Sequence, residues 1–375
     1  MFKLNNSIQH YDWGKTDWLP RFLGEANENN QPWAELWMGS HPKAPSHRAS
    51  DMVPLDSLIE KEGEVLLGKD VCERFGRLPF LFKILAIEGP LSIQVHPSKA
   101  QAEEGFAREN QQGIEMTAFN RNYKDDNHKP EIICAVEPYT AMKGFRSFDE
   151  IHENFSPLIG MDTQELFAKG TIRDFYFNLI GLDESKKKLL LERASERLPD
   201  DLKGQWVRKL MTFYPGDISA LAPLYLNLIV LNKGEALFLP AGEMHAYLHG
   251  VGIELMANSD NVLRGGLTPK HMDLAELEKV VLFEHSPVHV LRKEDNNLYY
   301  SGADEFVLGE KEIDGEYILD CKKEAAIVLV FSGELAFNSE LNAREGEVIF
   351  LEAGNVPVSL KGKGKIFWAT VKKED

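Results

Sequence analysis

The amino-acid sequence predicts a mainly β fold with a helical insertion, in which two related β-barrels of the jelly-roll type are joined to an α-helical domain. Three observations predict it: short apolar runs broken by glycine and proline, a central block with helical periodicity, and an internal repeat of one β segment. The 375 residues are 43% apolar and 27% charged, a composition typical of a globular protein with more than one domain.

The first 146 residues read as strands separated by turns, with apolar runs such as 78–87 and 132–136. The character changes at Ser147. From there apolar residues recur every fourth position among charged ones, at Leu190, Ala194, Leu198, Leu202, Trp206 and Leu210. We therefore expect a first barrel made of residues 1–146 and 217–284, with a helical insertion domain at residues 147–216.

The repeat predicts a second barrel in residues 285–375. Residues 234–250 and 346–362 are identical at eight of 17 positions. Each copy is expected to be a strand that turns at a glycine, Gly242 or Gly354, and doubles back.

The two copies differ where polar chemistry would lie. His245 of the first copy aligns with Pro357 of the second, and Tyr247 aligns with Ser359. A site in the first barrel would thus be missing from the second, which is expected to be non-catalytic and to cover the first barrel or mediate association.

Charge and cysteine content limit the possible partners and compartment. The chain has 42 Lys and Arg against 59 Asp and Glu, a net charge of −17, which repels nucleic acid and acidic membranes. Three widely spaced cysteines form no disulfide pattern, and the N-terminus has no signal-peptide pattern. The longest uncharged run has 15 residues, too few to span a bilayer. We expect a cytoplasmic protein that binds neither nucleic acid nor membranes; no oligomeric state is predicted.

Two clusters combine residue types that bind metals. In the alternating segment 91–97, Gln94 and His96 would point to the same side, because side chains alternate along a strand. After His128, Pro130 favours extended backbone at Lys129, so Lys129 and Glu131 would also share a face. The alternatives are a solvated strand face and a surface ion pair.

Two further clusters follow the helical block. His245 and Tyr247 share a face after the strand 236–239, although a buried structural histidine would also fit. Arg264 precedes two glycines and follows Glu254 and Asp260, a pattern that suits an anion clamp. The alternative is an ordinary loop with a salt bridge.

Together these segments resemble type I mannose-6-phosphate isomerase, a zinc-dependent family of the cupin superfamily. The resemblance rests on Gln94-Val95-His96-Pro97, on 126–131, on 240–247 and on 259–270. It extends to Tyr11-Asp12-Trp13-Gly14 and to 78–83, so it runs from the first residues into the second half of the chain.

The resemblance implies two cupin barrels, the first catalytic, and one Zn²⁺ per chain held by Gln94, His96, Glu131 and His245. The implied reaction interconverts mannose 6-phosphate and fructose 6-phosphate by moving a proton between C1 and C2. An enediolate would form on the way, and a divalent metal would stabilise its charge.

The remaining site residues are assigned by role. Arg264 matches the family's catalytic arginine, and the proton shuttle is one of Lys129, Glu254, His128 or Asp260. Phosphate and sugar contacts are expected from Lys83, Arg264, Tyr247, Trp13 and Lys270, because a phosphate needs cations at the mouth of the pocket.

Two alternative functions must be weighed against the isomerase. An iron-dependent cupin oxygenase usually has two histidines and a carboxylate, so the neutral Gln94 and the cation Arg264 count against it. A catalytically silent, sugar-binding or regulatory cupin would need neither Arg264 nor the charged residues near it, and an isomerase assay separates the two.

Overall fold

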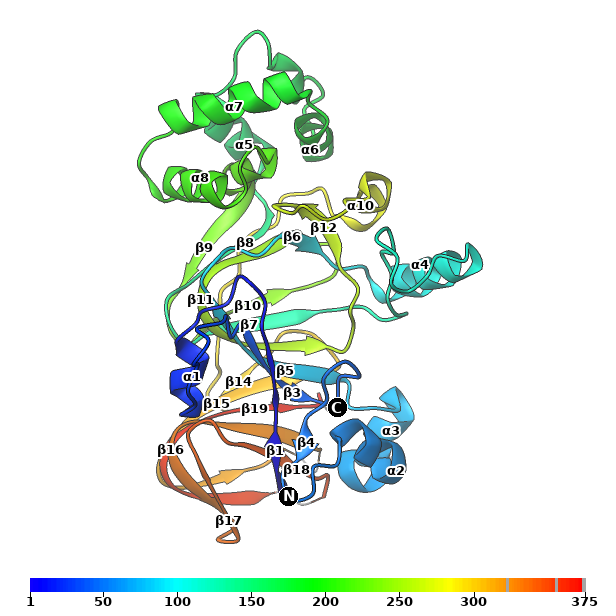
Figure 1. Ribbon diagram of the computed structural model, residues 1–375, viewed down its shortest axis with the longest axis vertical. Coiled ribbons are helices and arrows are strands. Elements are labelled where there is room, and N and C mark those ends of the chain that lie inside the picture. Colours follow the sequence, from blue (N-terminus) through cyan, green and yellow to red (C-terminus); the bar gives the residue numbers. More distant parts are fainter. Residues whose placement is uncertain (322–323, 355–356, 373–375) are drawn as a thin grey trace.

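The computed structural model describes residues 1–321, 324–354 and 357–372 and shows a mainly β protein with several helices. Two antiparallel sheets lie one above the other, and a group of helices covers the end of the molecule opposite the N-terminus (Figure 1). Within the described ranges no helix is both long and apolar enough to cross a bilayer.

The larger sheet has 11 strands and is organised around β11 (His245–Ala257), which pairs with β5, β6, β7 and β8. Because one long strand contacts four others, residues distant in sequence meet along it. The other strands of this sheet are β2 (Ser7–Gln9), β3 (Glu35–Gly39), β5 (Phe80–Ile87), β6 (Ile93–Val95), β7 (Glu131–Ala135), β8 (Tyr139–Phe145), β9 (Leu226–Leu231), β10 (Glu235–Leu239), β12 (Leu263–Gly266) and β13 (Leu291–Arg292).

The smaller sheet has eight strands and contains most of the C-terminal residues. They are β1 (Phe2–Asn5), β4 (His47–Arg48), β14 (Leu298–Tyr299), β15 (Val307–Leu319), β16 (Ala326–Phe337), β17 (Leu341–Arg344), β18 (Val348–Leu351) and β19 (Val358–Thr370). β1 pairs with β18 and with β4, so the start of the chain lies in this sheet, which the sequence did not predict.

The repeated segments form equivalent structures. The turn glycines Gly242 and Gly354 both have left-handed φ angles, 82° and 80°. The two strands of a copy do not form a hairpin, however: β7 lies between β10 and β11, and β16 lies between β18 and β19. The expectation that each copy doubles back on itself is wrong, because a strand from elsewhere in the chain is inserted between the two.

In the helical block, polar residues cap the N-termini of the helices. Ser147 and Glu150 form a capping box at α5, and aspartates cap α7 and α8. The block comprises α5 (Phe148–Phe155), η1 (Gln164–Phe167), α6 (Ile172–Ile180), α7 (Glu184–Arg197), α8 (Leu202–Phe213), η2 (Ile218–Leu221) and α9 (Ala222–Tyr225).

Helices also occur where only strands were expected or no helix was assigned, at α1 (Trp18–Leu23), α2 (Leu55–Leu67), α3 (Lys69–Phe75), α4 (Lys99–Gln111) and α10 (Leu274–Val280). α4 was missed because it has few large apolar residues and buries only Ala102, Gly105 and Glu109, so it has no wide apolar stripe. The signal that could have found it is the capping box formed by Ser98 and Gln101.

The two sheets share one apolar core. It combines residues of the larger sheet, such as Phe82 and Ile253, with residues of the smaller one, such as Phe306 and Phe367. The C-terminal sheet is thus packed directly against the sheet that carries the predicted site residues.

Candidate active site

A cavity of about 880 Å³ lies against the larger sheet. Side chains from β3, β5, β6, β7, β11 and β12 line it, and the segments 118–124 and 267–271 form part of its wall. A volume of this size is typical of a small-molecule site.

Three buried side chains meet at the wall of this cavity, which one of them, Glu131, helps to line. His96 follows β6, Glu131 begins β7 and His245 begins β11. Nε2 of His96 lies 3.2 Å from Oε1 of Glu131, and Nε2 of His245 lies 3.6 Å from Oε2. Their potential ligand atoms all lie within 4.8 Å of one another, so a single metal ion could contact all three.

The two histidines are prepared to act as neutral ligands. Nδ1 of His96 donates to the carbonyl of Asn261 at 2.7 Å, and Nδ1 of His245 donates to the carbonyl of Glu243 at 3.0 Å. The lone pair is therefore on Nε2, and both Nε2 atoms are buried without a hydrogen-bond partner among the described residues. Burial lowers the pKa of His96 to about 4 and also lowers that of His245. Buried, neutral and unpartnered nitrogens beside a carboxylate fit a divalent metal.

Glu131 is ionised. Burial raises the pKa of this carboxyl, but the nearby charge of Lys129 is the main cause that holds it well below its usual range. Nζ of Lys129 lies 2.8 Å from Oε1, as the shared face predicted, and the hydroxyl of Tyr247 donates to Oε2 at 3.0 Å.

Gln94 belongs to the same region. It lines the cavity, and it is paired in register with His245 of β11 and with Arg264 of β12. The strand pairing thus puts a neutral amide next to the three buried side chains.

A buried cluster of charges lies across the cavity. Lys83 on β5 is directly opposite Glu254 on β11, and Nζ of Lys83 lies 2.9 Å from Glu254 and 3.6 Å from Glu35. Burial lowers the pKa of Lys83, but these two carboxylates raise it more, so the ammonium is charged. Burial raises the pKa of Glu254 to about 7 even though Lys83 is close.

Sequence reasoning missed Glu35, whose carboxylate accepts a hydrogen bond from the indole of Trp37. Its signal was a lone acid within the apolar segment 33–38.

Arg264 carries a charge that no described carboxylate compensates. Its only described side-chain hydrogen bond runs from Nη1 to the hydroxyl of Ser92, at 2.8 Å, and burial lowers the pKa of Arg264. Lys270 lines the same cavity, and the charge of Arg264 lowers the pKa of Lys270. Two cations close enough to disfavour each other suit an anionic ligand.

Asp260 lines the cavity and contacts two basic residues, Lys43 and His41, that the sequence analysis did not single out. Nζ of Lys43 lies 2.9 Å from its carboxylate, and Nε2 of His41 lies 3.6 Å away. Burial lowers the pKa of His41 to about 4, so this ring is neutral near pH 7.

The structure brings most of the predicted site residues to one cavity. The residues that line it are Trp13, Lys83, Gln94, Lys129, Glu131, Tyr247, Glu254, Asp260, Arg264 and Lys270. His96 and His245 lie behind Glu131. His128 is the exception: it is not a lining residue, and its ring contacts Glu305.

Asn261 clamps the loop before β7. Its Oδ1 accepts the backbone N–H of Lys124 at 2.6 Å, and its Nδ2 donates to the carbonyls of Asp125 and Asn127, at 2.8 and 2.9 Å. Because the carbonyl of Asn261 also accepts from His96, one residue orients a candidate metal ligand and the neighbouring loop.

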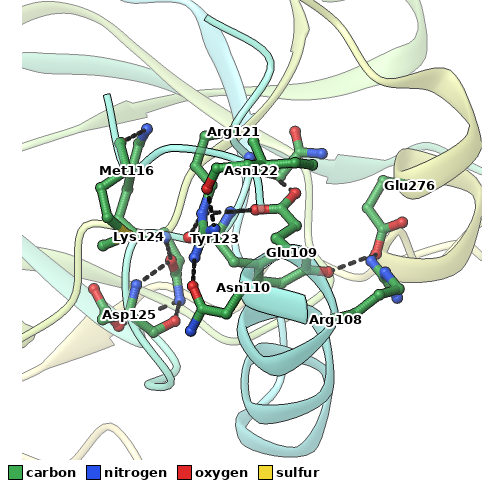
Figure 2. A network of polar contacts seen from close by, with 12 residues as sticks. Arg108, Glu109, Asn110, Met116, Arg121, Asn122, Tyr123, Lys124, Asp125 and Glu276 are labelled. Atoms are coloured by element: carbon green, nitrogen blue, oxygen red, sulfur yellow. Dashed lines mark hydrogen bonds and ion pairs between the residues drawn. The ribbon is translucent and has the colours of Figure 1, made fainter. Parts of the chain in front are cut away.

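Figure 2 shows that the same loop is also fastened to α4. The carboxylate of Glu109 accepts the backbone N–H of Tyr123 at 2.9 Å and lies 3.0 Å from the guanidinium of Arg121. The hydroxyl of Tyr123 donates to Glu276 of α10 at 2.8 Å. This wall of the cavity is therefore held by buried, paired charges.

Residues 1–148 match the family described as "Phosphomannose isomerase type I, catalytic domain". The chain is similar to mannose-6-phosphate isomerase of Escherichia coli (strain K12), 40% identical over 98% of both proteins. It is also similar to the Homo sapiens protein of that name, 31% identical over 96% of this chain and 95% of that one.

Solved structures agree. A lysine-to-alanine variant of phosphomannose isomerase from Salmonella typhimurium superposes with a TM-score of 0.92 at 37% identity and covers 99% of both chains. A zinc-bound mannose 6-phosphate isomerase superposes with a TM-score of 0.91 at 38% identity, again over 99% of both.

Proposed function

Because this chain belongs to the type I phosphomannose isomerase family, we propose that the cavity described above is its active site. The chain is a zinc-dependent isomerase that interconverts mannose 6-phosphate and fructose 6-phosphate. The observation that carries the site assignment is a buried His-Glu-His cluster beside a cavity that also holds the uncompensated charge of Arg264. Neither an oxygenase nor a silent binding protein is needed to explain it.

We propose that zinc is held by Gln94, His96, Glu131 and His245. The unpartnered Nε2 atoms of the two histidines support this, as does the register that puts Gln94 beside His245. One carboxylate and three neutral ligands leave a divalent ion with net positive charge. When bound, zinc supplies a Lewis acid that polarises a substrate oxygen.

Arg264 and Lys270 are the proposed phosphate ligands. Lys83 and Lys129 each have a carboxylate oxygen within 2.9 Å, so their charges are already compensated. Arg264 has no such partner in the described chain, and its guanidinium offers several donors to a phosphate. Trp13 and Tyr247 line the space left for the sugar.

Glu254 is the proposed proton shuttle. A carboxyl whose pKa is raised to about 7 by burial can accept and return a proton near neutral pH. In this scheme it takes the proton from C2 of the aldose and delivers it to C1, and the hydroxyl proton of O2 passes to O1. Lys83 holds the carboxylate of Glu254 in place at 2.9 Å. Lys129 and Asp260, which line the same cavity, would orient the substrate hydroxyls.

We further propose the domain organisation expected from the sequence. Residues 1–146 and 217–284 would form the catalytic cupin barrel, residues 147–216 a helical insertion domain, and residues 285–375 a second, non-catalytic cupin barrel. The equivalent strand arrangement around β7 and around β16 supports two related barrels. Cytoplasmic location is proposed from the three free cysteines, and lack of nucleic-acid binding from the net charge of −17.

Replacing one proposed zinc ligand tests the assignment. In His245→Ala, zinc content and isomerase turnover should fall together, turnover by more than about 100-fold, because even indirect supports of metal sites cost 10–100-fold. Metal analysis and a coupled assay for fructose 6-phosphate measure the two quantities.

His249→Ala is the matched control: this histidine lies on the same strand, and its half-exposed ring faces Glu88. A zinc-free His245→Ala protein with normal turnover would contradict the proposal.

A further inference from the structure

Residues 125–130 carry Lys129 into the cavity and lead directly to Glu131. One side of this segment is fastened to the chain that follows β11. Nδ2 of Asn127 donates to the carbonyl of Asn258 at 3.1 Å, and the N–H of Ala257 donates to the carbonyl of Pro130 at 3.1 Å. These contacts and the Asn261 clamp all come from the end of β11 and the loop that joins it to β12.

The other side is held by a residue from the C-terminal part of the chain. Nε2 of His128 lies 2.5 Å from Oε1 of Glu305. Burial raises the pKa of Glu305, but the hydrogen bond from His128 lowers it more, so the carboxylate is ionised. An ionised carboxylate only accepts hydrogen bonds, and Nε2 of His128 is therefore the donor in a charge-assisted bond.

Glu305 is itself rigidly placed. It lies just before β15, between Ala303 and Phe306, which are both buried in the core shared by the two sheets. The neighbouring Asp304 is different, because its exposed carboxylate pairs with Lys372 at the surface. Of these two adjacent acids, only Glu305 reaches the segment that enters the cavity.

We propose that Glu305, which lies just before β15 of the C-terminal sheet, is a positioning residue for the isomerase reaction. Its carboxylate holds His128, and the fixed position of His128 keeps Lys129 against Glu131. Nζ of Lys129 lies 2.8 Å from Oε1 of Glu131, and Pro130 restricts the backbone between them, so a shift at His128 is passed on to Lys129. The inference rests on the proposed roles of Lys129 and Glu131.

The role predicted here for His128 differs from proton transfer. Its ring is turned toward Glu305 and does not line the cavity, so it acts through the backbone of its own segment. Displacing a catalytic group by about 1 Å can cost up to 10²-fold in rate, which makes a contact outside the cavity measurable in turnover.

The test compares Glu305→Ala with Asp304→Ala, the adjacent acid, in zinc-supplemented enzyme. Glu305→Ala should lower kcat roughly tenfold with little change in KM, because outer supports of a site typically cost 10–100-fold. Asp304→Ala should match wild type. Glu305→Gln should restore most of the loss, since its amide oxygen still accepts from His128.

A double variant shows whether Glu305 acts through His128. His128→Ala alone and His128→Ala with Glu305→Ala should have the same kcat. Losses that multiply in the double variant, or a Glu305→Ala protein with the kcat of Asp304→Ala, would overturn the proposal. If Glu305→Ala does not fold, His128→Ala decides it: a kcat roughly tenfold below wild type is expected, and a wild-type kcat is the contrary result.

The proposed function fails in a different way. Wild-type protein that binds no zinc or does not isomerise mannose 6-phosphate would refute the active-site assignment. An active wild type that is insensitive to Glu305 would refute only this inference.

Discussion

Arg264→Ala removes a charge in the cavity that no described carboxylate compensates. At about 4 Å and an effective dielectric constant of about 20, two unit charges interact by about 4 kcal/mol. Only the part of this interaction energy that is stronger in the transition state than in the bound substrate affects the rate. If that part is about 3 kcal/mol, the rate falls about 100-fold, which is also the usual cost of losing a transition-state charge contact.

The cost to folding should be smaller. Arg264 makes one described side-chain hydrogen bond, from its charged guanidinium to the neutral hydroxyl of Ser92, and such a bond contributes about 1.5 kcal/mol or somewhat more to the free energy of unfolding. Zinc content should be unchanged, because no described contact joins Arg264 to His96, Glu131 or His245.

A coupled isomerase assay, metal analysis and thermal unfolding on the same preparations check these three expectations. Ser92→Ala is the matched control, since it removes the hydrogen bond and keeps the charge, and its loss in kcat/KM should stay below about tenfold. Arg264→Lys keeps a charge without the planar donors and should be intermediate. If Arg264→Ala keeps more than about a tenth of the wild-type kcat/KM, its charge is not used in the transition state. If it loses zinc, Arg264 supports the metal site instead.

Two predictions concern stability. Glu109→Ala leaves Arg121 and the N–H of Tyr123 without their buried partner, so the free energy of unfolding should fall by about 3–5 kcal/mol in denaturant titrations. Glu104→Ala, on the exposed face of the same helix, should change it by less than about 0.5 kcal/mol, and equal effects would contradict the reasoning. The pKa of His41 in the folded protein is about 4, below its ordinary value of about 6.5. As the pH falls below about 6.5, His41 is therefore protonated in the unfolded chain before it is protonated in the folded protein. Its neutral form thus contributes stability that is lost on acidification to about pH 4, by up to about 3 kcal/mol, and His41→Asn should show a correspondingly weaker pH dependence. Parallel pH curves for the two proteins would refute this.

Local sequence patterns were enough to predict much of the fold. In the helical block, apolar residues recur at every fourth position and polar residues cap the helices. Both patterns involve residues within one or two helical turns of each other, and the structure confirms helices there. The repeat likewise predicted two equivalent strand-turn-strand units, each with a glycine in the left-handed region. These features are local, so they are visible in the order of the residues.

The errors came from elements stabilised by distant contacts. The polar helix α4 is held by buried pairs such as Glu109 with Arg121, which lie on either side of a loop. β1 joins the C-terminal sheet because β18, more than 300 residues away, completes its hydrogen bonds. Glu35 and His41 were missed for the same reason, because their roles depend on charged residues that are distant in the sequence.

The sequence by itself determined the chemistry of this protein: the metal-binding residue types, the lone arginine beside two glycines, and the alternation that puts pairs of them on one face of a strand. Only the tertiary structure decided which of them meet. Gln94 and Glu131 both lie beside β11 because β6 and β7 pair with its two ends, opposite His245 and Met256. Folding also decided which charges are compensated, leaving Lys83 between two carboxylates, Arg264 facing the cavity, and His128 turned to the C-terminal sheet. Charge compensation depends on distances in space, and those distances exist only once the strands have paired.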